Sequence, residues 1–286
     1  MSTNSASGVS SSKALNKSIS SSEATGGAGR PSRWIALIVP SLAQLMVILD
    51  STIVNIALPT AQLDLGLSSD DRQWVVTGYA LTFGSLLLLG GRLSDLFGRK
   101  RMFIIGVIGL AAASVLGGIA NGFDVLLNAR IAQGAFAALL APAALSMVSV
   151  TFADNAADRG RAFGVFGAVS GAGGALGLLL GGVLTQSVSW RWCLLVNLVI
   201  AVIALFGAFV WLRDSARPER VRLDIAGSVT IILGLVGIVY GLGDAASKGW
   251  VDSVTLGSVI GGVVLVAVFA RIERRAAHPC CPSGSS

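Results

Sequence analysis

A single charged side chain interrupts a long apolar run in the segment Leu49-Asp50-Ser51-Thr52-Ile53-Val54-Asn55-Ile56-Ala57-Leu58-Pro59. The apolar run begins near residue 34, so Asp50 is expected at membrane depth. A second apolar run carries Arg130 in the same way. A charge in the hydrocarbon region costs roughly 2.5–3.5 kcal/mol on insertion scales, so it is usually kept where it faces a cavity or a partner. The two residues therefore indicate a path for ions or solutes, and a transporter is the first hypothesis.

The composition is typical of a membrane protein. Of the 286 residues, 53% are apolar and 13% are charged, whereas a soluble domain carries about 25% charged residues. The 36 glycines are consistent with membrane helices that pack closely. The net charge of +6 does not indicate a nucleic-acid partner, because the basic residues lie in short loops between apolar runs, as the positive-inside rule describes.

The residue types that most enzymes and metal sites need are scarce. Cys193 lies in an apolar run, and Cys280 and Cys281 are adjacent in the tail. These positions give neither a disulfide framework nor metal-ligand spacing. The single histidine, His278, lies outside the apolar runs, so an intramembrane serine protease would lack its base. No paired-histidine zinc motif and no phosphate loop occurs in the sequence. We expect neither an enzyme nor a cofactor nor a metal.

Eight segments are long and apolar enough to be membrane helices, since a span needs about 20 residues. They cover residues 34–58, 73–91, 102–120, 125–150, 162–186, 190–212, 224–243 and 253–272. The expected fold class is an all-α integral membrane protein. Its expected parts are a disordered cytoplasmic tail (1–33), a six-helix bundle (34–212), a basic linker (213–223), two additional transmembrane helices (224–272) and a short cytoplasmic tail (273–286).

The basic residues are distributed unevenly between the two sides of this arrangement. Most lie in the N-terminal tail, the loops after the second and fourth spans, the linker and the C-terminal tail. The opposite side has only Arg72, Arg191 and Lys248. Since basic loops stay in the cytoplasm, we expect a multi-pass protein of the inner (plasma) membrane with both termini cytoplasmic. Spans one to three and four to six are candidates for inverted repeats, with Asp50 and Arg130 on the first helix of each.

Five motifs occur in one order along the chain. They are the segment around Asp50, Gly91-Arg92-Leu93-Ser94-Asp95-Leu96-Phe97-Gly98-Arg99-Lys100, Arg130-Ile131-Ala132-Gln133-Gly134, Gly173-Gly174-Ala175-Leu176-Gly177-Leu178-Leu179-Leu180-Gly181-Gly182, and Trp190-Arg191-Trp192 through Asn197. Together they resemble the major facilitator superfamily, in particular drug:proton antiporter family 2, the fourteen-span multidrug exporter type. The resemblance covers about residues 34–275. Departures are Leu178, where the fifth-span motif normally has proline, Leu96, where arginine is frequent, and Val199, where relatives often carry proline.

The resemblance also implies a part that this chain does not contain. Members of that branch have two six-helix bundles with two extra helices between them. This chain instead ends in Cys280-Cys281-Pro282-Ser283-Gly284-Ser285-Ser286, soon after the eighth predicted span. We therefore expect the N-terminal part of a transporter, apparently truncated after the eighth span, with the C-terminal bundle missing.

Asp50 is the first candidate for proton coupling. Desolvation disfavours the charged form of a buried carboxyl, so Asp50 could take up and release protons near neutral pH, or pair with a cationic substrate. With the resemblance, the candidates for proton coupling or substrate contact are Asp50, Asn55, Arg130 and Gln133. The alternatives are a structural Asp50 bonded to a neighbouring helix and a structural ion pair or carbonyl contact of Arg130. Whether Asp50 and Arg130 pair directly stays open.

Two further motifs receive roles by resemblance. The loop after the second span is implied to be a cytoplasmic latch, in which Asp95 pairs with local arginines and with a helix N-terminus of the other bundle. Its residues are Gly91, Asp95, Gly98, Arg99 and Lys100. The plainer alternative is a turn in a basic loop. The antiporter motif of the fifth span is carried by Gly173, Gly177, Gly181 and Gly182. Small residues at this spacing allow close helix contact, so simple packing explains them equally well.

The expected function is a proton-coupled antiporter that exports small amphiphilic compounds such as drugs or antibiotics, present here as its N-terminal part. The alternative is a non-transporting truncated fragment, or a half-subunit that needs a C-terminal bundle. The expected partners are a small amphiphilic substrate, protons, the lipid bilayer and the missing C-terminal half, and no nucleic acid.

Overall fold

The computed structural model describes residues 30–212, 225–249 and 252–275, and every regular element among them is an α-helix. The helices are α2 (Arg30–Leu65), α3 (Ser69–Phe97), α4 (Arg99–Gly118), α5 (Phe123–Thr151), α6 (Ala156–Ser187), α7 (Arg191–Trp211), α8 (Ile225–Lys248) and α9 (Ser253–Arg275). The expected all-α fold class is thereby confirmed. The predicted N-terminal tail, linker and C-terminal tail lie wholly or largely outside the described residues.

Six helices, α2 to α7, are long and apolar enough to cross a membrane. They coincide with the first six predicted spans. In α8 and α9 the described apolar stretches are shorter, Thr230–Ala245 and Ser253–Phe269. The last two spans therefore remain predictions, although helices of 24 and 23 residues occupy both places.

The first helix is longer than the predicted span 34–58, because α2 continues through Pro59 to Leu65. A proline inside a helix removes only one backbone hydrogen bond, and membrane helices tolerate that loss. The helix ends at Gly66, whose φ of 65° is left-handed. The amide of Leu67 then donates to the Gln62 carbonyl at 3.0 Å. Ser68 starts α3 with a capping box, in which Ser68 and Asp71 each accept the other's backbone N–H.

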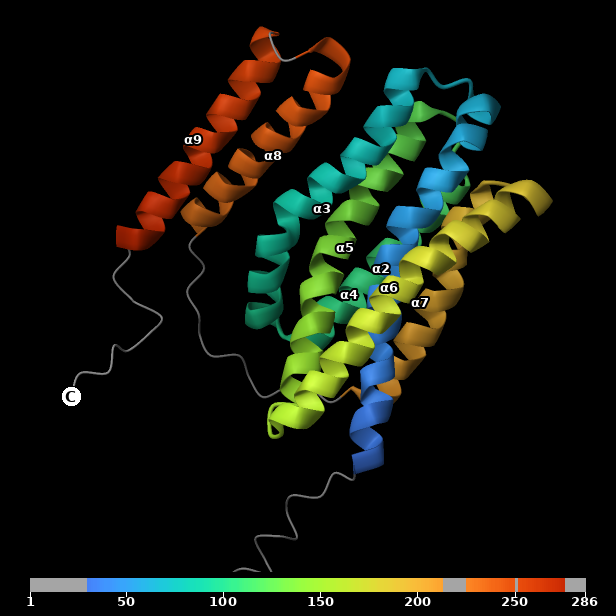
Figure 1. Ribbon diagram of the computed structural model, residues 1–286, viewed down its shortest axis with the longest axis vertical. Helices are drawn as coiled ribbons and strands as arrows, with labels where there is room; N and C mark the ends of the chain where they lie inside the picture. Colours follow the sequence, from blue (N-terminus) through green and yellow to red (C-terminus); the bar gives the residue numbers. More distant parts are fainter. Residues whose placement is uncertain (1–29, 213–224, 250–251, 276–286) are drawn as a thin grey trace, which may run out of the picture.

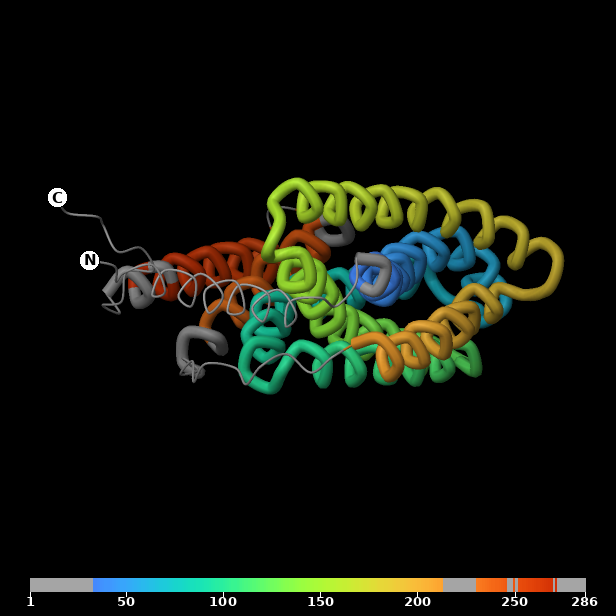
Figure 2. The backbone as a smooth tube through the Cα atoms, turned by 90° about the horizontal axis from the view of Figure 1, so that it is seen from below, coloured from blue at the N-terminus to red at the C-terminus, as the bar shows by residue number. Residues whose placement is uncertain are grey.

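The helices α2 and α5 form the centre of the six-helix bundle, and they run in opposite directions (Figure 1). Helices α3 and α4 both pack on α5. In the same way, α6 and α7 both pack on α2. Exchanging the first three helices with the next three therefore preserves the packing pattern. This agrees with the expected inverted repeats. The α8–α9 pair lies beside α3, outside the six-helix bundle (Figure 2).

Glycines allow the close approach of α3 and α5. A Cβ atom added to Gly90 would overlap the backbone carbonyl of Ala138 on α5. Backbone atoms cannot move aside as a flexible side chain can, so the two helices would have to separate.

We expect Gly90→Ala to destabilise the bundle by about 1–3 kcal/mol, the usual effect of overpacking. The matched control is Gly164→Ala on α6, where an added Cβ meets nothing within 4 Å. Because alanine favours a helix over glycine, the control is expected to be neutral or slightly stabilising. Thermal unfolding of the purified chain in detergent measures both. An equal melting temperature for the two variants would contradict the prediction.

Candidate functional site

Asp50 lies at the middle of α2, with both carboxylate oxygens engaged by neighbouring helices. Oδ2 accepts a hydrogen bond from Arg130 Nη1 at 3.0 Å, which is also a salt bridge. Oδ1 accepts from the amide nitrogens of Gln133 at 2.8 Å and Asn197 at 2.6 Å. The Asp50 side chain has no exposed surface, and that of Arg130 is only 3% exposed. The direct pairing that the sequence left open is therefore present in the structure.

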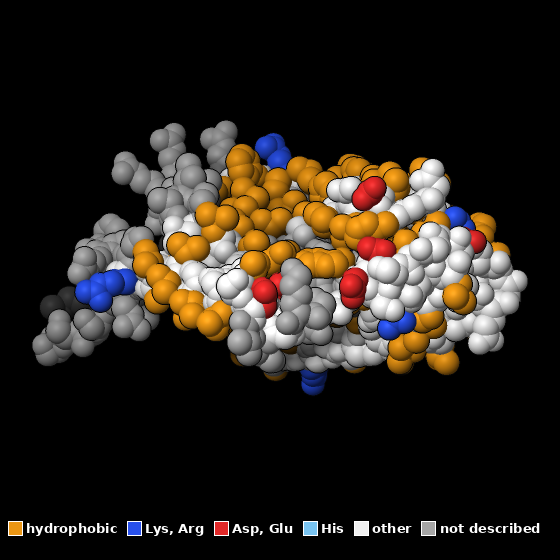
Figure 3. All heavy atoms as spheres, turned by 90° about the horizontal axis from the view of Figure 1, so that it is seen from above, with side chains coloured by type: hydrophobic (Ala, Val, Ile, Leu, Met, Phe, Trp, Pro, Cys, Tyr) orange, Lys and Arg blue, Asp and Glu red, His pale blue; other side chains and the backbone are white. Residues whose placement is uncertain are grey.

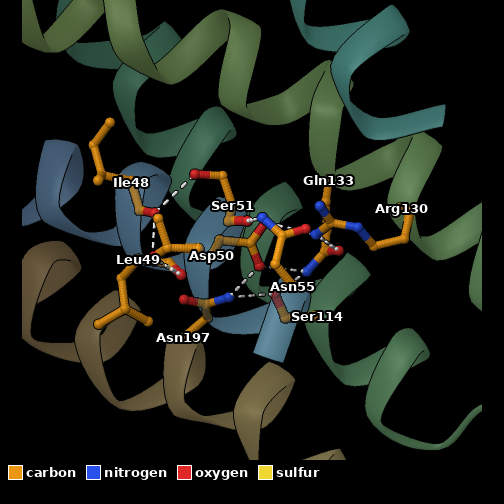
Figure 4. A network of polar contacts seen from close by, with 10 residues as sticks. Ile48, Leu49, Asp50, Ser51, Asn55, Ser114, Arg130, Gln133 and Asn197 are labelled. Carbon is orange, nitrogen blue, oxygen red and sulfur yellow. Dashed lines mark hydrogen bonds and ion pairs between the residues drawn. The ribbon is translucent and has the colours of Figure 1, made fainter. Parts of the chain in front are cut away.

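The arrangement of the partners follows from helix periodicity. Arg130 and Gln133 are three residues apart on α5, so they lie on one face of that helix. Their side chains are also joined to each other, with Arg130 Nη1 donating to Gln133 Oε1 at 2.9 Å. Asn197 reaches the same carboxylate from α7 (Figure 4). Side chains from two helices, α5 and α7, thus bind a single acid on α2.

Ser114 on α4 adds a fourth helix to the network. Its hydroxyl accepts from Gln133 Nε2 at 2.8 Å and from Asn197 Nδ2 at 3.2 Å. The amides of Gln133 and Asn197 therefore bridge Ser114 to the carboxylate of Asp50. Figure 4 shows these side chains pointing toward one another between the helices. A buried polar network of this kind fixes its members in place when it is satisfied.

The guanidinium of Arg130 also lies over an aromatic ring. Its Cζ atom is 4.1 Å from the centroid of Tyr79 on α3, a cation–π geometry. Tyr79 stacks in turn on Phe83, with the ring centroids 6.0 Å apart. Within the described part of the chain, three buried polar atoms of this cluster have no hydrogen-bond partner: Arg130 Nε, Tyr79 Oη and Asn197 Oδ1. The cluster therefore retains spare donors and an acceptor beside the ion pair.

This geometry can hold a proton-accepting group away from bulk water. A carboxylate at this depth stays charged only because it is paired and hydrogen-bonded. Arginine cannot lose its proton in a protein, so Asp50 is the titratable member of the pair. Taking up one proton would neutralise Asp50 and leave the Arg130 charge without its partner. A single proton would thereby alter the contacts between α2 and α5.

Asn55, the fourth candidate from the sequence, lies outside this network. Its side chain is exposed and donates to the Ser51 carbonyl one turn earlier at 3.1 Å. Five residues along a helix turn the side chain by about 140° from that of Asp50, since each residue adds about 100°. The structure thus brings together Asp50, Arg130 and Gln133, and leaves Asn55 on another face of α2.

The loop motif after the second span forms a tight turn between α3 and α4. Gly98 has a φ of 95°, a region that L side chains rarely adopt. Asp95 and Arg99 face each other across this turn, with Oδ1 and Nη2 3.5 Å apart. A Cβ on Gly91 would lie 3.8 Å from Pro142 on α5, an ordinary contact. Lys100 follows Arg99 in the first turn of α4 and is not free of partners.

Three of the four glycines of the fifth-span motif face α2. A Cβ atom at Gly173 would lie 3.1 Å from Leu45, one at Gly181 would lie 3.1 Å from Ile56, and one at Gly177 would overlap Thr52. At Gly182 an added Cβ would meet nothing within 4 Å. The structure therefore gives Gly173, Gly177 and Gly181 a packing role against the helix that carries Asp50. That contact adjoins the network, since Thr52 and Asp50 belong to the same turn.

The sequence did not select Asn197, Ser114 or Tyr79 as members of the acid's network. Asn197 carried a usable signal, because it is the one amide in the apolar helix α7. Ser114 carried none, since a serine in a helix can satisfy its hydroxyl on its own backbone.

In the described residues no cluster of His, Cys, Asp or Glu could hold a metal ion, and Cys193 is buried and free. His278, Cys280 and Cys281 lie outside those residues.

Comparison with known proteins gives one consistent result. The sequence model of the family named Major Facilitator Superfamily matches residues 41–272. The puromycin resistance protein pur8 of Streptomyces alboniger is 50% identical over 254 residues, which are 89% of this chain and 50% of that protein. The cephamycin export protein CmcT of Amycolatopsis lactamdurans is 40% identical over 250 residues, 86% of this chain and 51% of that protein. The chain thus spans about half the length of the curated relatives that it matches.

A solved structure shares the same helical architecture. The crystal structure of a peptide transporter POT in complex with sulfate superposes with a TM-score of 0.64 at 17% sequence identity. The match covers 85% of this chain and 53% of that one. At this identity the likeness concerns the fold alone.

Proposed function

The chain belongs to the Major Facilitator Superfamily, and from that membership we propose that it is the N-terminal part of a proton-coupled antiporter for small amphiphilic compounds such as antibiotics. It is a multi-pass membrane protein and not an enzyme, as its sequence indicated. The names of the relatives, a puromycin resistance protein and a cephamycin exporter, support an exported antibiotic as the substrate class.

The observation that carries the proposal is the buried carboxylate of Asp50 between four helices. An acid without exposed surface is costly to keep at membrane depth, and such residues mark proton relays and substrate paths. In the proposed cycle a proton from outside binds Asp50 and releases its ion pair with Arg130. The proton leaves toward the cytoplasm when Arg130 returns to the carboxylate. Gln133 holds both partners and so orients the exchange.

The other motif residues take supporting roles in this proposal. Asn55, exposed on α2, would contact substrate and not the proton site. The loop motif around Asp95 and Arg99 would be the latch that meets the C-terminal bundle on the cytoplasmic side. The glycines of α6 would keep that helix close to α2, so that a change at Asp50 reaches the neighbouring helix. Support for the last role comes from the contacts of Gly173, Gly177 and Gly181 with α2.

We also propose the inner membrane as the location, with both termini in the cytoplasm. The order of the helices places Asp64, Asp70, Asp71 and Asp124 at the end of the bundle where α2 ends and α3 begins, with Arg72 and Arg191 among the basic residues there. Figure 3 looks onto this end and shows acidic and basic side chains scattered among hydrophobic ones. The opposite end carries Arg33, Arg99, Arg159 and Arg161 among others. This distribution follows the positive-inside rule.

The proposed organisation keeps the boundaries expected from the sequence. Residues 34–212 form the transporter bundle, 213–223 a cytoplasmic linker, and 224–272 the two additional transmembrane helices. The tails 1–33 and 273–286 are cytoplasmic. The proposed partner is a C-terminal six-helix bundle, which the relatives' greater length supports.

Transport into everted membrane vesicles tests the proposal. Vesicles would carry either this chain alone or this chain fused to the second half of the puromycin resistance protein, and would receive a proton gradient and labelled puromycin. We expect the fusion to accumulate puromycin until a protonophore is added, and the chain alone to accumulate none. Accumulation that persists with the protonophore would rule out proton coupling. A well-folded fusion that never accumulates the drug would favour the non-transporting fragment instead.

A further inference from the structure

Two neighbouring hollows lie near the end of the bundle where α2 and α6 begin, and Trp34 lines both. The first has a volume of about 160 Å³ and is lined by Arg33, Trp34, Phe152, Asn155 and Asp158. The second has a volume of about 230 Å³ and lies between α2 and α6. Its walls beyond Trp34 are Leu37, Ile38, Ser41, Leu42, Val165 and Val169. Trp34 lines both, so a polar hollow and an apolar groove lie on either side of this residue.

The order of these two environments matches a membrane boundary. Arg33 begins the membrane-length part of α2, and the groove follows the same helix from Trp34 to Leu42, toward the middle of that stretch. Eight residues from Arg33 to Ser41 correspond to about 12 Å of helix, since each residue rises 1.5 Å. Trp34 is held by Phe152, with ring centroids 5.2 Å apart. Tryptophan at such a depth is typical of the headgroup region.

The groove also contains a polar group without a partner. The Ser41 hydroxyl is buried, with the residue 5% exposed, and it makes no hydrogen bond within the described part of the chain. A buried hydroxyl without an acceptor is costly, and a serine in a helix usually bonds its own backbone instead. Ser41 therefore has a hydrogen bond to offer to an occupant of an otherwise apolar groove.

The polar hollow presents charges of both signs. Arg33 lines the hollow and is paired with Asp154 at 3.1 Å through one nitrogen, and a guanidinium carries five N–H donors in all. Asp158 lines the same hollow, and its Oδ1 atom is 3.9 Å from Arg161 Nη1. A guanidinium suits a phosphate, and a carboxylate suits an ammonium group. A headgroup that carries both charges complements this hollow better than a purely anionic one.

We infer that the two hollows form a binding site for a single zwitterionic phospholipid of the phosphatidylethanolamine type. Its phosphate lies at Arg33 and its ammonium at Asp158. One acyl chain follows the groove between α2 and α6, and the Ser41 hydroxyl donates to an ester carbonyl. The groove ends at Leu42, eight residues before Asp50 on the same helix, and neither hollow is lined by a residue of the Asp50 network. The site therefore does not depend on the proposed transport activity.

Native mass spectrometry of the full chain, delipidated in detergent, tests this site. Phosphatidylethanolamine or phosphatidylglycerol is added at equal mole ratio, and the lipid that each chain retains is counted. We expect one retained phosphatidylethanolamine per chain and clearly weaker retention of phosphatidylglycerol. The variant Val169→Trp fills the groove, and Arg33→Gln removes the phosphate partner. Each is expected to weaken retention about tenfold, the effect of losing one charged hydrogen bond or its equivalent.

The matched control is Val202→Trp, an equally large change at a position of α7 that is 60% exposed. It is expected to retain the lipid as the original chain does. If Val169→Trp proves unfolded by circular dichroism, Arg33→Gln decides, because its pair with Asp154 is largely exposed and contributes little to stability. Unchanged retention by a folded groove or arginine variant would overturn the site. Equal retention of the two lipids would overturn the headgroup assignment, and a dimer that excludes lipid would replace it with a second copy of the chain.

Discussion

Replacing Arg130 by methionine is expected to lower the free energy of unfolding by about 3–5 kcal/mol, the usual effect of removing one member of a buried ion pair. Asp50 would keep its hydrogen bonds from Gln133 and Asn197 but lose the only cation that lies against it in the described residues. Tyr79 would lose the charge over its ring as well. Thermal unfolding of the purified chain in detergent, followed by circular dichroism, measures the effect.

Two companion variants make this measurement specific to the pair. The double variant Asp50→Leu with Arg130→Met removes both charges, and replacing a whole buried ion pair by apolar residues is often neutral. We therefore expect it to recover most of the stability that Arg130→Met loses. Asn55→Ala, on the same helix but exposed, is expected to change the stability by less than about 0.5 kcal/mol. An Arg130→Met chain as stable as the original would mean that the ion pair does not hold α2 and α5 together.

The sequence was sufficient to predict the helices and the position of the two charges inside the bundle. Long apolar runs have few alternatives in a membrane, and a charge inside one must find a partner. The helix boundaries were less predictable, as the continuation of α2 through Pro59 shows. A proline is a strong signal for the end of a soluble helix, but the bilayer favours keeping the remaining backbone hydrogen bonds.

The partners of Asp50 could be predicted only in part. Arg130 could be identified because a charge inside an apolar span is costly and needs a partner. Ser114 and Asn197, in contrast, join the network because of how α4 and α7 are rotated in the bundle. That rotation is set by packing, for which a single sequence gives no direct measure. The same holds for the glycines of α6: their spacing predicted a close contact, but only the structure shows that the partner is α2. Asn55 illustrates the reverse case, since a polar residue near Asp50 in sequence faces elsewhere.

Replacing Asp50 by asparagine is expected to abolish proton-driven puromycin accumulation in vesicles that carry the fusion protein. Asparagine has nearly the same shape and can still accept hydrogen bonds through its oxygen, but it cannot exchange a proton. The Arg130 charge would then lack its titratable partner throughout the cycle. The expected result is accumulation no greater than in vesicles without the protein, while Val202→Ala, at an exposed position of α7 with no role in the site, retains proton-driven transport. Full proton-coupled accumulation by the Asp50→Asn protein would show that Asp50 is structural.

A second readout separates lost coupling from lost structure. Vesicles preloaded with unlabelled puromycin exchange it for labelled puromycin without any proton gradient, so exchange requires a folded, mobile transporter but no proton transfer. If Asp50 couples the proton to export, Asp50→Asn should retain exchange while it loses accumulation. Loss of both activities, together with a lower melting temperature like that of Arg130→Met, would instead assign Asp50 to the ion pair that holds α2 against α5. The two outcomes differ because a coupling residue is needed only for accumulation driven by the proton gradient. A structural residue is needed for both accumulation and exchange, since both require a folded transporter.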